Sequence, residues 1–279
     1  MIDFDTLCLS GGGIKGLLTL GALHYCQENF LLKNVKTYVG TSVGAMIGYL
    51  LAIDYTPKEI LAYLCTRQIL ERIQNFNFIS ILNGNDGVVS FSPIQDHLEK
   101  LTINKIGRFI TLKDLKEQFD KTLICTTYNK TQQKIEYLSY ENYPDLPCIT
   151  AIRMSSNLPL LFERYKYMNN YYVDGGVVSN LSVEAVPKDS HALGIWTCLE
   201  DEYKKGDLDE VNILEEFYQL LFVPVSQITE IKLQNVGDCF KVMKIPYMPI
   251  KIFHFNVPSK DKLNMFSHGF SFAKEFFES

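Results

Sequence analysis

Short apolar runs that end in glycine, each followed by a stretch with helical spacing, occupy the first 55 residues. Thr6–Leu9 is apolar and leads into three glycines, and residues 17–30 then place apolar side chains at helical intervals. Val35–Val39 is rich in β-branched residues and stops at Gly40, and Ala45–Ile53 is again helical. A strand, a glycine turn and a helix repeated in this way predict βαβ units and a parallel sheet.

The rest of the chain continues the alternation of strands and helices. Residues 56–101 predict mostly helix, interrupted by a polar loop at 83–87, and the first helix begins with Thr56-Pro57-Lys58-Glu59, a capping box with proline in the first turn. Strands are predicted at 123–127, 135–138, 171–173 and 192–198. Further helices are predicted at 148–157, after the acidic stretch that runs to Glu216, and at 260–277.

These elements predict an α/β fold with a central, mostly parallel sheet flanked by helices in a three-layer α/β/α sandwich. No internal repeat and no long linker divides the chain, so a single domain is expected over residues 1–279. Its catalytic core is expected at about 5–200 and a C-terminal helical extension at about 201–279.

Composition and charge narrow the function classes. The net charge of −5 gives no basic surface for nucleic acid. No run approaches 18 uncharged apolar residues, and the N-terminus carries two acids where a signal peptide needs basic residues, so a cytoplasmic protein is expected. Seven cysteines in no zinc-like spacing indicate reduced, buried thiols, with no metal and no cofactor. The sequence leaves the oligomeric state open.

A G-x-S-x-G pattern lies between the second predicted strand and its helix. Ser42 stands at its centre, and Gly40 and Gly44 supply the small neighbours that a nucleophile on a sharp turn requires. The helix that follows would place its positive end beside the serine. By itself the pattern also fits an ordinary strand-to-helix turn.

Consecutive glycines after the first strand form a second candidate site. The segment Gly11-Gly12-Gly13-Ile14-Lys15-Gly16 can point backbone N–H groups at an anion. A dinucleotide site would need an acid after the next strand, where the chain has Val39-Gly40-Thr41, and a P-loop would need Lys in place of Leu17. An oxyanion loop beside Ser42 fits better.

Asp174-Gly175-Gly176 at the end of a predicted strand is the third element. A serine hydroxyl needs a base, and no histidine has a glycine-framed or strand-end position suited to that role. The five histidines are His24, His97, His191, His254 and His268. Asp174 is therefore the candidate base.

Together, G-G-G-x-K-G, G-x-S-x-G about 30 residues later, and D-G-G resemble the patatin-like phospholipase family. Residues 110–115 and the Ala151–Pro159 segment, with its A-x-x-x-S-x-x-x-P pattern, are also similar to the family, and the resemblance covers about residues 5–200. One departure is Asn180-Leu181-Ser182, where the family commonly has Asn-x-Pro.

The resemblance implies a Ser–Asp dyad of Ser42 and Asp174, without histidine. It also implies an oxyanion hole from the backbone around Gly11, Gly12, Gly13 and Lys15. The implied reaction is calcium-independent hydrolysis of a fatty acyl ester of a phospholipid or other acyl lipid. Two alternatives remain open: a Ser–Asp–His triad completed by His254 or His268, and a non-catalytic lipid-binding protein.

Two apolar segments are candidates for peripheral membrane contact or an acyl channel. They are Ile69–Leu82 and Phe217–Val225, and the Tyr-rich stretch Tyr137–Tyr143 could sit at a water–lipid boundary. For the two apolar segments the pattern favours burial as core helices, and for the Tyr-rich stretch packing in an edge strand is an equal explanation.

Overall fold

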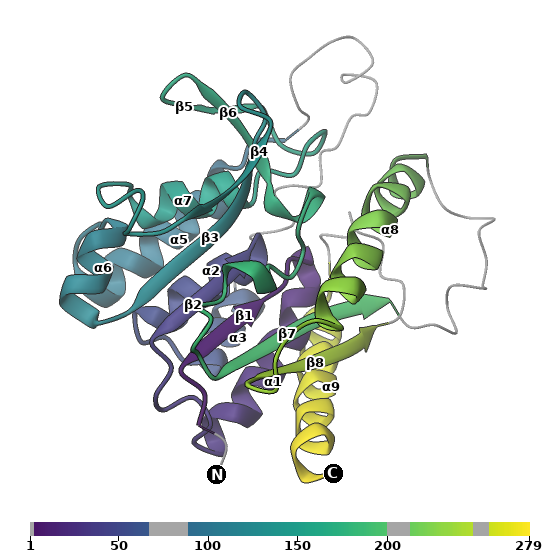
Figure 1. Cartoon of the computed structure of the whole chain (residues 1–279). Coiled ribbons are helices and arrows are strands. Elements are labelled where there is room, and N and C mark those ends of the chain that lie inside the picture. Colours follow the sequence, from purple (N-terminus) through teal and green to yellow (C-terminus); the bar gives the residue numbers. More distant parts are fainter. Residues whose placement is uncertain (1–2, 67–88, 200–212, 248–256) are drawn as a thin grey trace.

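A mostly parallel sheet forms the centre of the protein in a computed structural model that describes residues 3–66, 89–199, 213–247 and 257–279 (Figure 1). Within these residues it has eight strands: β1 (Thr6–Leu9), β2 (Thr37–Thr41), β3 (Thr122–Asn129), β4 (Lys134–Leu138), β5 (Tyr165–Tyr167), β6 (Asn170–Asp174), β7 (Ala192–Leu199) and β8 (Phe240–Tyr247).

The strand order is β5-β6-β3-β2-β1-β7-β8, and β4 pairs with β3 in addition. The pairs β1–β2, β1–β7, β2–β3 and β7–β8 are parallel, which confirms the predicted βαβ arrangement. β4, β5 and β6 add antiparallel pairs at one side of the sheet.

The described helices are α1 (Gly16–Glu28), α2 (Val43–Ala52), α3 (Pro57–Thr66), α5 (Ser92–Ile106), α6 (Leu112–Phe119), α7 (Cys148–Ser155), α8 (Ile213–Leu233) and α9 (Ser259–Glu278). The helix start predicted at Thr56 is confirmed, because Thr56 and Glu59 exchange the two hydrogen bonds of a capping box. Thr56 N–H donates to Glu59 at 2.7 Å and Glu59 N–H donates to the Thr56 hydroxyl at 3.2 Å.

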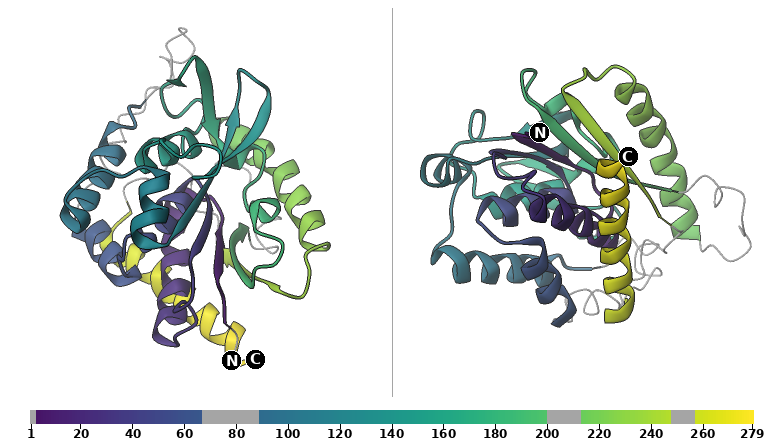
Figure 2. Two further views of the ribbon diagram at one scale, coloured as in Figure 1. Left: turned by 60° about the vertical axis from the view of Figure 1, so that its left-hand side comes forward. Right: turned by 90° about the horizontal axis from the view of Figure 1, so that it is seen from below.

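The two faces of the sheet are covered differently. Leu7 and Leu9 of β1 face a large core shared with α1, α2 and α9, whereas Cys8 faces a smaller cluster with Trp196. The small cluster is closed by the segment after β6 and by the end of α8. Figures 1 and 2 show α8 on the opposite side of the sheet from α1 and α9. The layers follow from the alternation of side chains along each strand.

The C-terminal region is only partly the helical extension that the pattern predicts. β8 lies within it and pairs in parallel with β7 along its whole length, so residues beyond 201 complete the central sheet. Lys241, Lys244 and Pro246 interrupt the apolar pattern of this segment and hid the strand. The edge position of β8 explains them, because edge strands tolerate charge and proline. β5 was also not predicted.

Three predictions fall wholly or partly outside the described residues. They are the loop at 83–87, the apolar segment Ile69–Leu82 and most of the acidic connection that precedes α8. In the described part of the chain, no helix has both the length and the apolar content needed to cross a bilayer.

All seven cysteines lie within the described residues, where none of them forms a disulfide. Cys8, Cys26, Cys125 and Cys148 are buried, in agreement with the expectation of reduced core thiols. Cys239 is exposed, so the prediction of buried thiols was wrong at this position. It lies in the turn just before β8, an edge strand with one neighbour in the sheet.

Candidate active site

Ser42 and Asp174 meet because β2 and β6 approach the same edge of β3 from opposite directions. β2 runs parallel to β3 and ends at Thr41, opposite Thr126, and Ser42 follows directly. β6 runs antiparallel and ends at Asp174, opposite Thr127, the next residue of β3. The two strand ends therefore lie head to head, and the Ser42 side chain lies near enough to the Asp174 carboxylate to favour its ionised form and lower its pKa.

The backbone at Ser42 has the strained geometry of a nucleophile elbow. Its φ of 56° and ψ of −122° are sparsely populated for a residue with a side chain. The turn is tight enough that a β-carbon on Gly44 would lie 2.3 Å from the carbonyl oxygen of Leu9 in β1. Ser42 is the N-cap of α2, so the positive end of that helix lies beside its half-buried side chain.

Ser155, the last residue of α7, anchors the elbow. Its hydroxyl accepts the backbone N–H of Ser42 at 3.0 Å and donates to the carbonyl of Thr126 at 2.6 Å. The next residue but one, Asn157, accepts the N–H of Asp174 at 2.9 Å through its carbonyl. The segment after α7 thus holds both strand ends, which gives a structural reason for the serine in the A-x-x-x-S-x-x-x-P pattern.

Asp174 is an unusual carboxylate because it is almost wholly buried. Its side chain is 3% exposed and accepts the N–H of Gly176 at 2.7 Å. Burial raises the pKa of Asp174 to about 6, although the nearby Ser42 side chain and the hydrogen bond from the Gly176 N–H both lower it. Desolvation is therefore the larger effect, and the carboxylate is a stronger proton acceptor than an exposed aspartate.

The glycine loop passes directly beside the elbow. A β-carbon on Gly11 would lie 3.4 Å from the β-carbon of Ser42. Gly13 has a φ of +57°, a left-handed conformation that favours glycine, and no neighbour within 4 Å of its missing side chain. The loop can thus present its backbone to the space next to Ser42.

The four residues predicted for the oxyanion hole differ in what their N–H groups do. Gly11 N–H donates to the carbonyl of Asn180 at 3.2 Å, and Lys15 N–H donates to that of Gly12 at 3.2 Å. The N–H groups of Gly12 and Gly13 donate to no acceptor in the part of the chain that is described. Of these four residues, Gly12 and Gly13 are therefore the ones whose N–H groups can donate to an oxyanion without breaking a hydrogen bond of the described fold.

The side chain of Lys15 turns to the end of β8 and away from bulk solvent. Its ammonium donates to the hydroxyl of Tyr247 and lies 4.0 Å from the centre of the same ring. β8, which the sequence pattern did not predict, thus supplies a contact that fixes the glycine loop.

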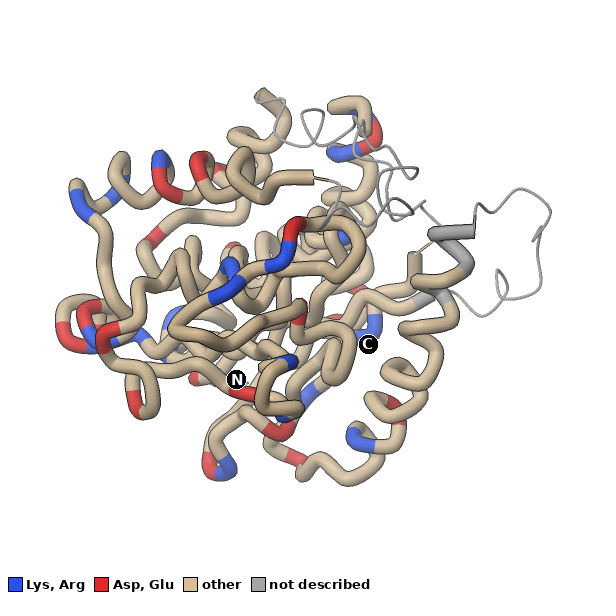
Figure 3. The backbone as a smooth tube through the Cα atoms, turned by 90° about the horizontal axis from the view of Figure 1, so that it is seen from above, with Lys and Arg blue, Asp and Glu red and all other residues tan. Residues whose placement is uncertain are grey.

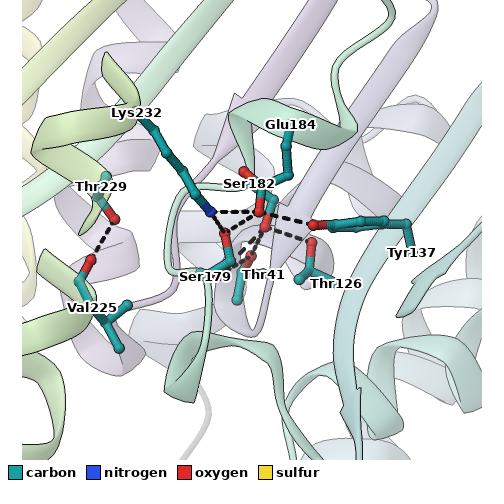
Figure 4. A network of polar contacts seen from close by, with 9 residues as sticks. All are labelled: Thr41, Thr126, Tyr137, Ser179, Ser182, Glu184, Val225, Thr229 and Lys232. Atoms are coloured by element: carbon teal, nitrogen blue, oxygen red, sulfur yellow. Dashed lines mark hydrogen bonds and ion pairs between the residues drawn. The ribbon is translucent and has the colours of Figure 1, made fainter. Parts of the chain in front are cut away.

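The loop after Asp174 is held by a buried polar network (Figure 4). Ser182, at the position where proline is common in the resembling family, accepts the Thr126 hydroxyl at 2.8 Å and lies 3.4 Å from the hydroxyl of Thr41. Thr41 precedes Ser42. Serine at this position therefore ties the loop behind Asp174 to the strand that carries Ser42.

Glu184 connects the same network to α8. It accepts hydrogen bonds from Tyr137, Ser179 and Lys232, each between 2.7 and 2.8 Å. Burial alone would raise the pKa of Glu184, but these hydrogen bonds outweigh it and the pKa lies below its ordinary value. Tyr137 of the Tyr-rich stretch is thus a hydrogen-bond donor within the fold.

The inner face of α8 covers the Asp174 end of the site. The Tyr218 hydroxyl donates to the carbonyl of Pro159, and burial together with the nearby Asp174 carboxylate raises the pKa of Tyr218. Phe222 lies 3.6 Å from the position of a β-carbon on Gly176. The pattern predicted an apolar helix here, but nothing in the sequence linked it to Asp174.

The described histidines have their contacts elsewhere. His24 pairs with Glu28, His97 with Tyr63, and His268 with the carbonyl of Pro246. His191 bonds through its backbone to Asp5, at the end of the sheet opposite Ser42. His254 lies outside the described residues. No group of three or more His, Cys, Asp or Glu within the described ranges is placed to hold a metal ion.

Comparisons with known proteins show which family this chain resembles. A sequence profile of the patatin-like phospholipase family matches residues 7–187. A probable lipid hydrolase of Invertebrate iridescent virus 6 is 33% identical over 190 residues, which is 66% of this chain and 64% of the viral protein. An intracellular phospholipase A2 of Caenorhabditis elegans is 24% identical over 76% of this chain, which corresponds to 19% of the worm protein.

Solved structures share the fold at low identity. VipD from Legionella pneumophila superposes with a TM-score of 0.59 and 15% identity, over 99% of this chain and 67% of that one. The type III effector ExoU of Pseudomonas aeruginosa superposes with a TM-score of 0.54 and 15% identity, over 98% of this chain and 52% of that one. The chain thus spans about half to two thirds of the length of these structures.

Proposed function

The chain belongs to the patatin-like phospholipase family, and on this premise we propose that it is a serine-dependent lipid acyl hydrolase. Its substrates are fatty acyl esters of phospholipids or glycerolipids, and its reaction passes through an acyl-enzyme on Ser42 without calcium. The proposal rests on the buried Asp174 carboxylate, which ends its strand head to head with the strand that leads into Ser42 and whose pKa is raised to about 6. This position and this pKa support a role for Asp174 as the general base.

In the first half of the reaction the Ser42 oxygen attacks the ester carbonyl carbon and its proton passes to Asp174. The carbonyl oxygen becomes an oxyanion, which the N–H groups of Gly12 and Gly13 and the positive end of α2 stabilise. The intermediate then collapses, the bond to the glycerol oxygen breaks, and Asp174 returns the proton to that oxygen. The lysolipid or alcohol leaves, and the acyl group remains on Ser42.

The second half uses water in place of the alcohol. Asp174 accepts a proton from a water molecule as the water oxygen attacks the acyl carbon. The second intermediate collapses, the bond between the acyl carbon and the Ser42 oxygen breaks, and the proton returns to Ser42. The fatty acid is released, and both side chains are restored.

An ordinary aspartate is a poor base for a serine hydroxyl, because its pKa is near 3.9. The burial of Asp174 moves its pKa toward neutrality, which reduces the difference between the pKa of the base and the much higher pKa of the serine hydroxyl. Electrostatic stabilisation of the oxyanion lowers the activation barrier further, and it is commonly the largest contribution to catalysis of acyl transfer.

The direct test is covalent labelling with a fluorophosphonate, read together with hydrolysis of phospholipid vesicles and of a short soluble ester. The wild-type protein is expected to be labelled and active, and Ser42→Ala to lose both properties. Asp174→Asn should lose hydrolysis by about a thousandfold or more while remaining folded. Substantial hydrolysis by either variant would refute the dyad.

Two further measurements separate this mechanism from its alternatives. Replacement of His254 and His268 together should leave soluble-ester hydrolysis within about twofold of the wild type, since no histidine takes part; a loss comparable to that of Ser42→Ala would favour a Ser–Asp–His triad. Hydrolysis should also be unchanged by excess EDTA. Restoration of EDTA-suppressed activity by added calcium would contradict the calcium-independent reaction.

A further inference from the structure

Helix α8 presents apolar side chains on two opposite faces. Its inner face packs on the site and the sheet, where Tyr218, Val225 and Thr229 are almost completely buried. Its outer face is open to solvent and carries apolar residues three or four positions apart, with Gln227 between them. The exposed apolar positions of this outer stripe are Phe217, Leu220, Val223, Pro224, Ile228 and Ile231.

The outer stripe is the main apolar patch on the described surface. Five of the twelve large hydrophobic residues exposed in the described residues lie on α8, and Leu220 is 65% exposed. Isolated exposed hydrophobics are common, but a contiguous row along one helix face marks an interaction site.

The stripe is also free of charge. Residues 217–229 contain no Asp, Glu, Lys or Arg, and Figure 3 shows α8 without charged positions along most of its length. The first charge of the helix after Phe217 is Glu230, which pairs with Lys244 at 2.5 Å. Burial of this face therefore removes no unpaired charge from water, and its occupant needs no charge of its own.

The same helix forms a wall of the active site. The Tyr218 hydroxyl donates to the carbonyl of Pro159, and the charge of the Asp174 carboxylate raises the pKa of Tyr218. Phe222 packs near Gly176. At the other end, Lys232 is held by Glu184 at 2.7 Å, within the network that leads to Thr41 (Figure 4). The helix is thus fixed to the site at both ends, and only its own width, about 10 Å, separates the outer stripe from the face that covers Asp174.

We propose that the outer stripe of α8 is a docking surface for a lipid bilayer. The inference rests on the proposed function, because a lipid acyl hydrolase finds its substrate in a bilayer and α8 joins the stripe to the site. The helix lies in the membrane interface with its apolar residues at the boundary between headgroups and acyl chains. The uncharged stripe predicts that binding does not depend on anionic lipid.

The test is flotation of the full-length protein with vesicles of phosphatidylcholine alone and of phosphatidylcholine mixed with phosphatidylserine. The double variant Leu220→Glu/Ile231→Glu is expected to bind both vesicles at least about tenfold more weakly than the wild type. Leu263→Glu is the matched control, because Leu263 is 50% exposed on α9 and remote from α8 in sequence. It should bind as the wild type does.

Hydrolysis of a short soluble ester separates this inference from the proposed function. The double variant should retain that activity, which also shows that it is folded, and should lose hydrolysis of vesicle lipids in proportion to its binding. A wild-type protein inactive on the soluble ester would refute the proposed function and leave the flotation result standing. Equal vesicle binding by wild type and double variant would overturn the docking surface. So would a wild-type dimer that the double variant converts to a monomer in light scattering, which would assign the stripe to a second copy.

Discussion

At the scale of single residues, the pKa of Asp174 predicts the shape of the pH–rate profile. The carboxylate must be ionised to accept the Ser42 proton, and burial raises its pKa to about 6. We expect kcat/KM for a soluble ester to be constant above pH 7 and to fall about tenfold per pH unit below pH 6. A profile that bends near pH 4 instead would mean that Asp174 titrates as an exposed aspartate does.

The same burial predicts that Asp174 costs stability at neutral pH. Its folded-state pKa lies above the unfolded value, so its favourable contribution is complete below about pH 4 and is lost as the pH rises through about 6. Asp174→Asn, which keeps an oxygen for the Gly176 N–H, should therefore be about 1–3 kcal/mol more stable than the wild type at pH 8. Urea unfolding at pH 8 and pH 4 measures this. An equal advantage at both pH values would mean that the charge is not its cause.

At the scale of an element, the C-terminal end of α7 sets the position of the nucleophile. Ser155→Ala removes the acceptor of the Ser42 N–H and is expected to lower kcat for a soluble ester about tenfold, with KM within about twofold. Ser156→Ala is a close control, because the neighbouring hydroxyl is also buried and has no hydrogen-bond partner among the residues that the structure describes. It should leave kcat unchanged. Equal losses in the two variants would point to general disturbance of α7.

At the scale of the whole molecule, the two ends of the chain are joined where α1 and α9 cross. A β-carbon on Gly269 of α9 would lie 2.0 Å from the carbonyl oxygen of Leu18 in α1, and one on Gly21 would lie 1.9 Å from that of Phe266. The helices thus touch backbone to backbone, and α1 begins directly after the oxyanion loop. The C-terminal helix therefore supports the site from the opposite end of the sequence.

This crossing predicts that a Gly→Ala substitution, which usually stabilises a helix, lowers the free energy of unfolding here. Alanine is the better helix former, so Gly269→Ala would stabilise an isolated helix by about 1 kcal/mol. Here it should destabilise the protein by about 1–3 kcal/mol, because the backbones must separate. Gly237→Ala, with nothing within 4 Å of the added carbon, should change the free energy of unfolding by less than about 0.5 kcal/mol. Both values come from urea unfolding, and a stable Gly269→Ala protein would exclude the close crossing.

The sequence by itself determined those features that depend on neighbouring residues. Apolar alternation and helical spacing located most strands and helices, and the strand–glycine–helix order predicted a parallel sheet. The glycines on either side of Ser42 and at Gly13 allowed the two turns to be predicted, because tight turns and a positive φ leave few residue types possible. Asp174 was identified through the need for a base and the strand that it ends.

Only the tertiary structure decided which of these elements meet and what environment they create. Ser42 and Asp174 lie 132 positions apart in the chain, and they face each other because β2 and β6 share one edge of β3, a pairing that no local pattern encodes. The raised pKa of Asp174 comes from burial by several distant segments. β8 escaped prediction because its edge position tolerates polar residues. The sequence marked Phe217–Val225 as either core or membrane-facing, and only the structure showed which of its side chains are covered, because periodicity marks apolar faces without telling which one the fold will cover.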